Sequence, residues 1–184
     1  MIPILLAGAP GVGKTHFAKQ LAASLGLSYQ FLSMGTMSAG WVLGGSAPTW
    51  SGARHGKIAA SLIDGEFGNP LYLLDELDKT GGDSRHDPYG ALLQLLERDT
   101  AQHFTDEYLD VAINASAIVW VATANDISLI PDYILSRMAV YEVPAPTEDE
   151  AFLSRSASTT GCAPNWSGTS SRSCPQWSFA PIVA

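Results

Sequence analysis

Short apolar runs alternate with amphipathic segments through the first 150 residues of the chain. The apolar runs that we expect to form buried strands are residues 2–7, 71–74, 117–122 and 140–143. Residues 14–25 and 88–98 instead place apolar side chains three or four positions apart, which predicts helices. Strands that are apolar throughout and are separated by helices are typical of a parallel sheet covered on both faces. The pattern therefore predicts an α/β fold.

The two predicted helices have recognisable ends and faces. The first puts Phe17, Leu21 and Leu25 on one face, and Gly26 is a favourable residue for ending it. Asp87 is the expected N-cap of the second helix. The apolar face of that helix consists of Ala91, Leu92, Leu95 and Leu96.

Polar residues follow three of the predicted strands. They are residues 8–15, the pair Asp75 and Glu76, and Asn125. Ligands of open parallel sheets bind beyond the carboxyl ends of the strands. We therefore expect these residues to lie around one site.

Composition and charge restrict the function classes. The chain has 184 residues, of which 46% are hydrophobic and 15% charged, a composition that argues against disorder over the whole length. With 10 Lys and Arg against 18 Asp and Glu, the formal net charge is −8, which argues against nonspecific nucleic-acid binding. No apolar run is long enough to cross a membrane, and the first residues lack the basic flank of a signal peptide. We expect a cytoplasmic protein.

The last 34 residues differ from the rest of the chain. They contain Arg155, Arg172, both cysteines and no acidic residue, and they show no helical or strand period. We therefore expect a folded core at residues 1–150 and an irregular Ser- and Pro-rich tail at residues 151–184. One hypothesis is that the tail is a frameshifted or otherwise non-native end, and the alternative is a native flexible tail.

A complete phosphate-loop motif follows the first predicted strand. It reads Gly8-Ala9-Pro10-Gly11-Val12-Gly13-Lys14-Thr15. The glycines let the backbone wrap round phosphate oxygens, and the helix that begins at Lys14 directs its N–H groups and dipole at the anion. We expect Lys14 to reach the β- and γ-phosphates and Thr15 to offer its hydroxyl to Mg²⁺. The alternative is a glycine-rich turn that matches by chance.

Two carboxylates end the strand at residues 71–74. In a nucleotide site Asp75 would hold Mg²⁺, directly or through water, and Glu76 would orient and deprotonate the attacking water. The alternative interpretation is an acidic turn that caps the next segment.

Two later polar residues suit the same chemistry. The amide of Asn125 could bind the γ-phosphate or the attacking water, with Thr123 nearby as support, or Asn125 could simply form a turn. Arg137 could be an arginine finger that stabilises charge in the transition state of a neighbouring subunit, or an ordinary surface residue.

Taken together, these segments resemble the AAA+ ATPase module, specifically that of the Lon protease family. The segments that carry the resemblance are residues 8–15, 71–79, 87–97 and 104–142. The resemblance implies a P-loop NTPase three-layer sandwich with a central parallel sheet, the AAA+ large subdomain. It also implies that Asp75 and Glu76 are the Walker B pair, that Asn125 is the sensor-1 residue, and that Arg137 is the arginine finger of a ring-forming ATPase.

The glycine-rich stretch at residues 33–57 has the composition of a mobile loop. Within it, Trp50 and the residues that follow resemble the Lon segment in which an aromatic residue grips unfolded polypeptide in the central pore. The alternative is that Trp50 packs on its own domain. Trp50 and Ser51 replace the aromatic–aliphatic pair of the family. Arg85 resembles a family arginine near the subunit interface.

The resemblance implies ATP and Mg²⁺ as ligands and ATP hydrolysis coupled, in a complete relative, to unfolding or remodelling of a client protein. Relative to the family we expect a core truncated at its N-terminal edge, with the helical lid missing. Such a chain alone should bind ATP weakly, turn over poorly and lack the neighbouring site of a homo-oligomeric ring. The alternative is a nonhydrolytic nucleotide-binding or regulatory module. Peptidase activity would need a partner that supplies a Ser–Lys pair.

Overall fold

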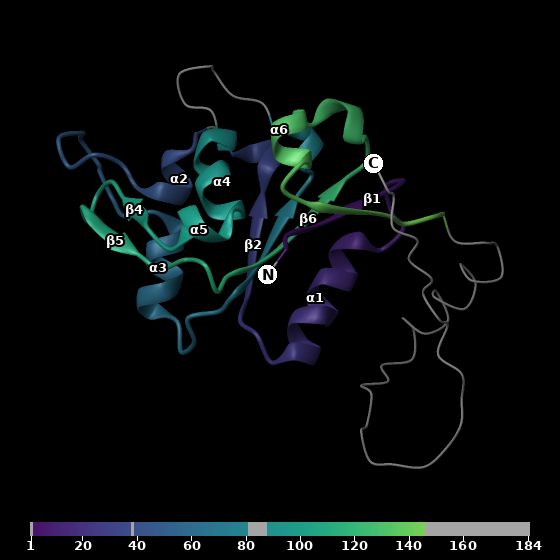
Figure 1. Cartoon of the computed structure of the whole chain (residues 1–184), viewed down its shortest axis with the longest axis horizontal. Coiled ribbons are helices and arrows are strands. Elements are labelled where there is room, and N and C mark those ends of the chain that lie inside the picture. The colour runs from purple at the N-terminus through teal and green to yellow at the C-terminus, as the bar shows by residue number, and fades with distance from the viewer. Residues whose placement is uncertain (1, 38, 81–87, 146–184) are drawn as a thin grey trace, which may run out of the picture.

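A five-stranded, wholly parallel sheet organises the chain (Figure 1). The computed structural model describes residues 2–37, 39–80 and 88–145. In spatial order the strands are β2 (Tyr29–Ser33), β3 (Leu71–Asp75), β6 (Val119–Ala124), β1 (Ile4–Ala7) and β7 (Ala139–Glu142). The predicted α/β fold with a central parallel sheet is confirmed.

Helices and a small hairpin complete the described part of the chain. The helices are α1 (Lys14–Leu25), α2 (Trp41–Gly44), α3 (Lys57–Asp64), α4 (Pro88–Leu96), α5 (Arg98–Ala101) and α6 (Asp132–Leu135). Short 3₁₀ turns are η1 (Met34–Thr36), η2 (Leu77–Lys79) and η3 (Ile127–Leu129). The antiparallel hairpin pairs β4 (Phe104–Asp106) with β5 (Val111–Ile113). None of the helices in the described ranges combines the length and the apolar character that crossing a membrane requires.

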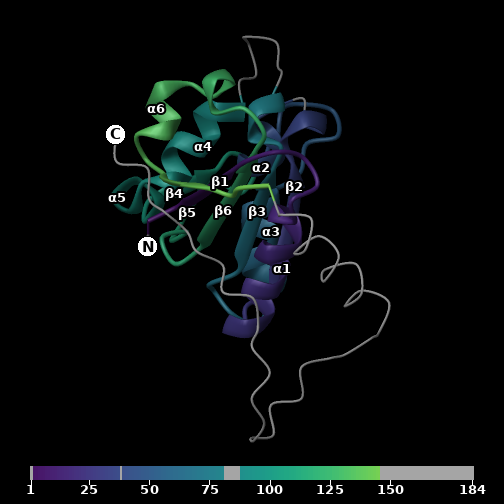
Figure 2. The same ribbon diagram turned by 90° about the vertical axis from the view of Figure 1, so that its right-hand side faces the viewer.

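Alternate residues of the strands feed two separate cores, one on each face of the sheet. On β1, Leu6 packs in the cluster that contains Ala18 and Ala22 of α1, whereas Leu5 packs in the cluster that contains Leu92 of α4. Figures 1 and 2 show α1 and α4 on opposite sides of the strands. Because successive side chains of a strand point to opposite faces, two buried faces require strands that are apolar throughout.

The first predicted helix has the bounds that we expected, but its apolar face was predicted only in part: Phe17 and Leu21 pack, partly buried, against the cluster that contains Ala18 and Ala22. Gly26 ends α1 with a left-handed φ of 65°, as glycine allows without a steric penalty. The buried apolar residues of α1 are Ala18 and Ala22, whereas Leu25 is 52% exposed. Small side chains face the sheet, and small side chains let a helix backbone approach closely.

The second predicted helix is divided. It ends at Leu96, Glu97 is extended (φ −99°, ψ 127°), and α5 follows. Leu92, Leu95 and Leu96 are buried as predicted. The proposed N-cap Asp87, Arg85 and the predicted tail at residues 151–184 lie outside the described residues.

The glycine-rich stretch contains more regular structure than its composition indicates. It includes η1 and α2, and Leu43 of α2 is completely buried. The sequence pattern also did not identify β2, α3 or the β4–β5 hairpin. Each of these is short or mixed in polarity, so a periodic signal barely develops.

Asp106 joins the glycine-rich stretch to the hairpin. Its side chain is completely buried, and Oδ2 accepts a hydrogen bond from the Gly56 N–H at 2.8 Å. Oδ1 accepts from the N–H groups of Tyr108 and Leu109 at 3.0 and 3.1 Å. Gly45, at φ 79°, lies so close that an added Cβ would sit 2.6 Å from Oδ1. The carboxylate thus bonds one end of the loop between residues 45 and 56 and lies in close contact with the other.

We predict that D106N lowers the free energy of unfolding by about 2–3 kcal/mol, because the new NH₂ group cannot accept the hydrogen bond that one backbone N–H now donates. Urea denaturation followed by circular dichroism measures the change. The matched control is D64N, at an exposed carboxylate at the end of α3. Equal stability of the two variants would contradict this role of Asp106.

Candidate active site

The phosphate loop connects β1 to α1 in a backbone conformation that suits an anion. Gly11 and Gly13 have φ values of 84° and 95°, a region in which residues with a Cβ are strained. The N-cap of α1 is Gly13, which has no side chain to cap the N–H groups at the helix start. Backbone N–H groups and the positive end of the helix dipole therefore face the place where an anion would bind.

Lys14 lies inside this loop and is only 8% exposed. Its Nζ donates hydrogen bonds to the carbonyls of Gly8 (2.6 Å) and Ala9 (3.0 Å) and to Oδ1 of Asn125 (3.0 Å). Desolvation by burial lowers the pKa of Lys14, and the nearby charges of Asp78 and Asp75 act in the opposite direction. The ammonium group is held where the phosphate loop and the end of β6 meet.

Asp75 and Thr15 come together although 60 positions separate them. The Thr15 hydroxyl donates to Oδ1 of Asp75 at 2.9 Å, and the Thr123 hydroxyl donates to the same oxygen at 2.8 Å. Thr123 Oγ1 in turn accepts from the backbone N–H of Glu76 at 3.0 Å. One carboxylate and two hydroxyls thus form a continuous hydrogen-bonded chain at the carboxyl ends of β3 and β6.

Glu76 stands directly after β3 in an unusual backbone conformation. Its φ of 57° lies in the left-handed region, which costs a residue with a Cβ of the order of 1 kcal/mol or more. Its carboxylate accepts a hydrogen bond from Lys79, three residues further on. That hydrogen bond is the main reason why the pKa of Lys79 is raised.

Asp78 is a third carboxylate in this region that sequence reasoning missed. Its Oδ2 accepts from the Asp126 N–H at 3.3 Å, and its buried Oδ1 has no hydrogen-bond partner among the described residues. Asp126 itself accepts from the hydroxyl and N–H of Ser128, which lower its pKa. Asp78 therefore fixes the turn that follows Asn125.

Arg137 has its hydrogen bonds away from the phosphate loop. Nη1 donates to the carbonyl of Tyr133 at 2.6 Å, and Nη2 donates to Oε2 of Glu97 at 3.5 Å. The side chain is one-third exposed. Within its own chain Arg137 thus contacts α6 and the end of α4.

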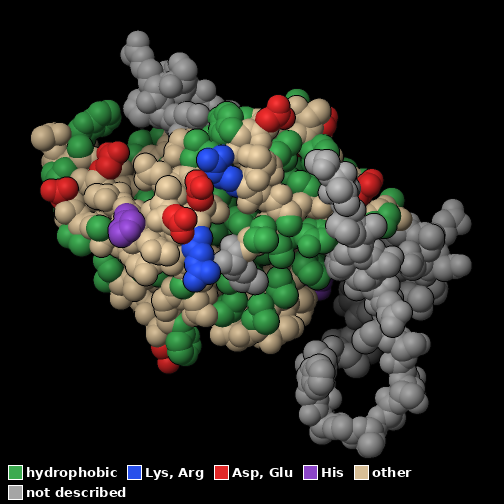
Figure 3. All heavy atoms as spheres, in the orientation of Figure 1, with side chains coloured by type: hydrophobic (Ala, Val, Ile, Leu, Met, Phe, Trp, Pro, Cys, Tyr) green, Lys and Arg blue, Asp and Glu red, His purple; other side chains and the backbone are tan. Residues whose placement is uncertain are grey.

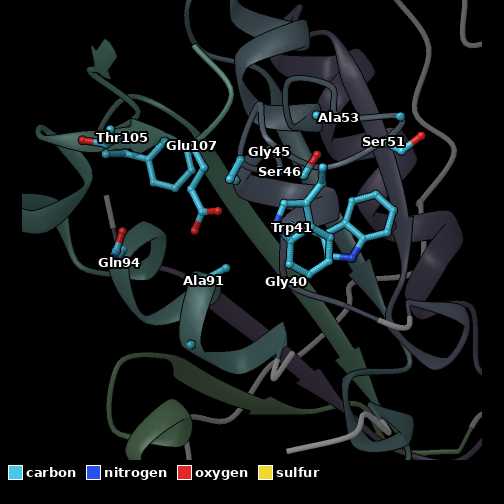
Figure 4. A pocket seen from close by; sticks show the side chains of 16 residues that line it. Gly40, Trp41, Gly45, Ser46, Ser51, Ala53, Ala91, Gln94, Thr105 and Glu107 are labelled. Carbon is cyan, nitrogen blue, oxygen red and sulfur yellow. The ribbon is translucent and has the colours of Figure 1, made fainter. Parts of the chain in front are cut away.

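Trp50 also lies outside the phosphate site. It is 60% exposed and lines a pocket of about 520 Å³ together with Trp41, Gln94, Phe104 and other residues (Figure 4). None of the residues that line this pocket belongs to the phosphate loop. The pocket beside Trp50 is therefore separate from the phosphate loop.

The residues at the strand ends fit ATP with Mg²⁺. No group of three or more His, Cys, Asp or Glu that could hold a metal exists within the described ranges. Mg²⁺ needs no such group, because it is usually bound by one or two carboxylates together with phosphate and water oxygens. Asp75 and Thr15 offer oxygen ligands next to a loop built for phosphate, and that donor set matches this preference.

Comparisons with known proteins agree with this geometry. The model of the AAA family, the "ATPase family associated with various cellular activities", matches residues 4–144. Lon protease of Wolbachia pipientis is 42% identical over 149 residues, which are 80% of this chain and 18% of that protein. The peroxisomal Lon protease homolog 2 of Arabidopsis thaliana is 41% identical over 149 residues, 80% of this chain and 17% of that protein. The chain thus spans about one-fifth of the length of these relatives.

A solved structure shows the same fold. The RuvB Holliday junction branch migration motor of Thermotoga maritima has a TM-score of 0.57 and 20% sequence identity, over 86% of this chain and 44% of that one. At this identity the likeness concerns the fold alone. The matched family model, the parallel sheet and the complete phosphate loop together show that the chain belongs to the AAA family of ATPases, with a core that resembles that of Lon.

Proposed function

We propose that this chain binds ATP with Mg²⁺ and hydrolyses the nucleotide. The observation that carries the proposal is the convergence of three separate segments beside the phosphate loop, where Lys14 bonds Asn125 and the adjacent Thr15 bonds Asp75. A glycine-rich turn that matched the motif by chance would not be expected to place Asn125 and Asp75 beside its lysine and threonine.

In this proposal residues 8–15 bind the phosphates through backbone N–H groups, and Lys14 binds the β- and γ-phosphates. Thr15 and Asp75 hold Mg²⁺, which when bound neutralises charge on the phosphate oxygens. Lys14 now satisfies two loop carbonyls and Asn125, so it exchanges some of these bonds for phosphate oxygens when ATP binds.

Glu76 is the proposed general base, and Asn125 is proposed to position the attacking water or the γ-phosphate. Glu76 must release Lys79 before it can accept a proton from water. That contact is exposed on both sides, so solvent screening makes it weak and easily exchanged.

Arg137 is the proposed arginine finger, which would act on the nucleotide of a neighbouring copy in a homo-oligomeric ring. Its partial exposure supports action in trans, and so do its hydrogen bonds in the described structure, which go to Tyr133 and Glu97 and not to the phosphate site of its own chain. An arginine supplied in trans stabilises transition-state charge and raises turnover by orders of magnitude.

We further propose that hydrolysis drives remodelling of a client protein that Trp50 contacts. The exposed indole and the wide pocket beside it support contact with a flexible chain. The acidic net charge argues against nucleic acid as the client. On the described part of the face in Figure 3, acidic and basic side chains lie near one another and form no broad basic surface. We keep the cytoplasm as the proposed compartment.

Residues 1–150 are the proposed extent of the ATPase core. All five strands of the sheet and both hydrophobic clusters lie between residues 4 and 143. The hypothesis of a separate tail at residues 151–184 stays a prediction.

A second candidate function is a nucleotide-binding regulatory module without hydrolysis. The contact between Glu76 and Lys79 favours it, because a carboxylate held by a lysine is a poorer base than a free one. The first prediction below separates the two functions.

We predict that E76Q reduces the ATP turnover number by roughly 100-fold or more, because an amide cannot accept a proton from water. Binding of a fluorescent ATP analogue should stay within about twofold, since Glu76 does not belong to the phosphate loop. Phosphate release and fluorescence anisotropy measure the two quantities. E66Q, at an exposed loop carboxylate, is the control, and equal turnover of E76Q and E66Q would favour the regulatory module.

We predict that K14M weakens binding of the ATP analogue by roughly 10- to 100-fold, because it removes a charged donor to phosphate. K19M, at an exposed position of the same helix, should bind as the unmodified chain does. Nucleotide affinity that is insensitive to K14M would refute the proposed phosphate site.

We predict that W50A weakens binding of a labelled, permanently unfolded polypeptide, such as reduced and carboxymethylated lactalbumin, by roughly tenfold, as for a buried aromatic contact. F67A removes another exposed aromatic side chain and should have little effect. The measurement is anisotropy in the presence of ATP. Similar losses in both variants would remove any special role of Trp50.

A further inference from the structure

Thr123 occupies a position that the proposed roles do not explain. It lies on β6 with only 2% of its surface exposed, in a strand whose neighbouring residues are apolar. Its hydroxyl donates to Asp75 Oδ1 and accepts from the Glu76 N–H. We infer that Thr123 is a positioning residue that sets the metal-binding carboxylate and the general base relative to each other. The inference rests on the proposed function.

The bond to Asp75 controls which atoms can face a metal. A hydroxyl has one proton and two acceptor lone pairs. Thr15 and Thr123 both point their protons at Asp75 Oδ1, which leaves the lone pairs of Thr15 available as ligands. Loss of the Thr123 bond would let the carboxylate rotate about its own side chain, and the Thr15 hydroxyl would lose its fixed acceptor.

The bond to Glu76 controls the backbone of the general base. A glutamate at φ 57° is in a disfavoured conformation and persists only where its surroundings hold it. The Glu76 N–H donates to the Thr123 hydroxyl at 3.0 Å, and the Glu76 carbonyl accepts from the Lys79 N–H at 2.9 Å. Since the backbone sets the direction of the Glu76 side chain, the hydroxyl of Thr123 determines where the base points.

Position on the sheet explains why this residue can serve both groups. β6 lies between β3 and β1, so its carboxyl end meets the end of the strand that carries Asp75 and the start of the phosphate loop. Two residues after Thr123, Asn125 bonds Lys14. The end of β6 thus supplies Thr123 to Asp75 and Glu76, and Asn125 to Lys14 of the phosphate loop.

The first test uses the protein without nucleotide or metal. T123V keeps the shape of the side chain but can neither donate nor accept, whereas T123S keeps the hydroxyl. We expect amide exchange at Glu76, measured by NMR, to become roughly tenfold faster in T123V and to stay close to the unmodified rate in T123S. Unchanged exchange in T123V would overturn the inference, whatever the chain does with ATP.

The second test uses Mg²⁺ and a fluorescent ATP analogue. T123V should raise the Mg²⁺ concentration for half-maximal nucleotide binding and lower ATP turnover by roughly 10- to 100-fold each, as for other residues that orient metal ligands. Metal-free nucleotide binding should stay within about twofold, since it depends on Lys14 and the loop. T123S should recover most of both losses.

V121A is the control for a loss of packing alone. Val121 is completely buried two residues earlier on the same strand and packs in the cluster that contains Ala18 and Ala22, and its side chain forms no hydrogen bond. V121A should lower the melting temperature without moving the Mg²⁺ dependence. If T123V does not fold, T123A takes its place in both tests.

The outcomes separate the two proposals. An unmodified chain that binds and hydrolyses ATP, with a T123V variant of unchanged Mg²⁺ dependence and turnover, overturns the inference alone. An unmodified chain that neither binds nor hydrolyses ATP overturns the proposed function, and the exchange rate of the Glu76 amide then still decides whether Thr123 holds that residue.

Discussion

The buried ammonium group of Lys14 is the charge on which the arrangement of the site depends. A desolvated cation is costly unless other groups replace its water, and burial accordingly lowers its pKa. Two carbonyls of the phosphate loop and the Asn125 amide oxygen provide that replacement. The loop therefore has to curl back over the lysine, and the end of β6 has to lie beside it. Pairing in the sheet brings the strand ends together, and the solvation requirement of Lys14 then fixes the loop and Asn125 around its ammonium group.

Asp106 is a second buried ionisable side chain whose water must be replaced by other groups, and it lies at a different place in the molecule. Three backbone N–H groups replace its water, and they come from the glycine-rich loop and from the hairpin. A buried carboxylate with a complete set of donors fixes the backbone that supplies them. The loop that presents Trp50 is therefore anchored at its base. Two buried ionisable side chains thus lie at different places: Lys14 in the phosphate loop, and Asp106 at the base of the loop that carries Trp50.

The sequence alone was sufficient where the local chemistry admits few alternatives. The phosphate loop needs glycine at positive φ, and Gly26 ends α1 for the same reason, so both could be identified directly. The face of α1 could be identified only in part, because the alanines of this helix are buried most deeply and Leu25 is exposed, and no count of apolar spacing contains that information. Asp78 was missed as a site residue, and Thr123 was expected only to support Asn125, because the importance of both arises from partners 47 or 48 positions away. Long-range hydrogen bonds leave no local pattern in a sequence.

The described site satisfies most of its own polar groups without a ligand, and this constrains how tightly ATP can bind. Lys14 already has three acceptors, and Glu76 already has Lys79. Phosphate oxygens must therefore replace existing bonds, and affinity reflects the difference between the two sets. The backbone N–H groups at the start of α1 are the exception, because no side chain caps them. Binding energy should thus come chiefly from the loop backbone and the helix dipole.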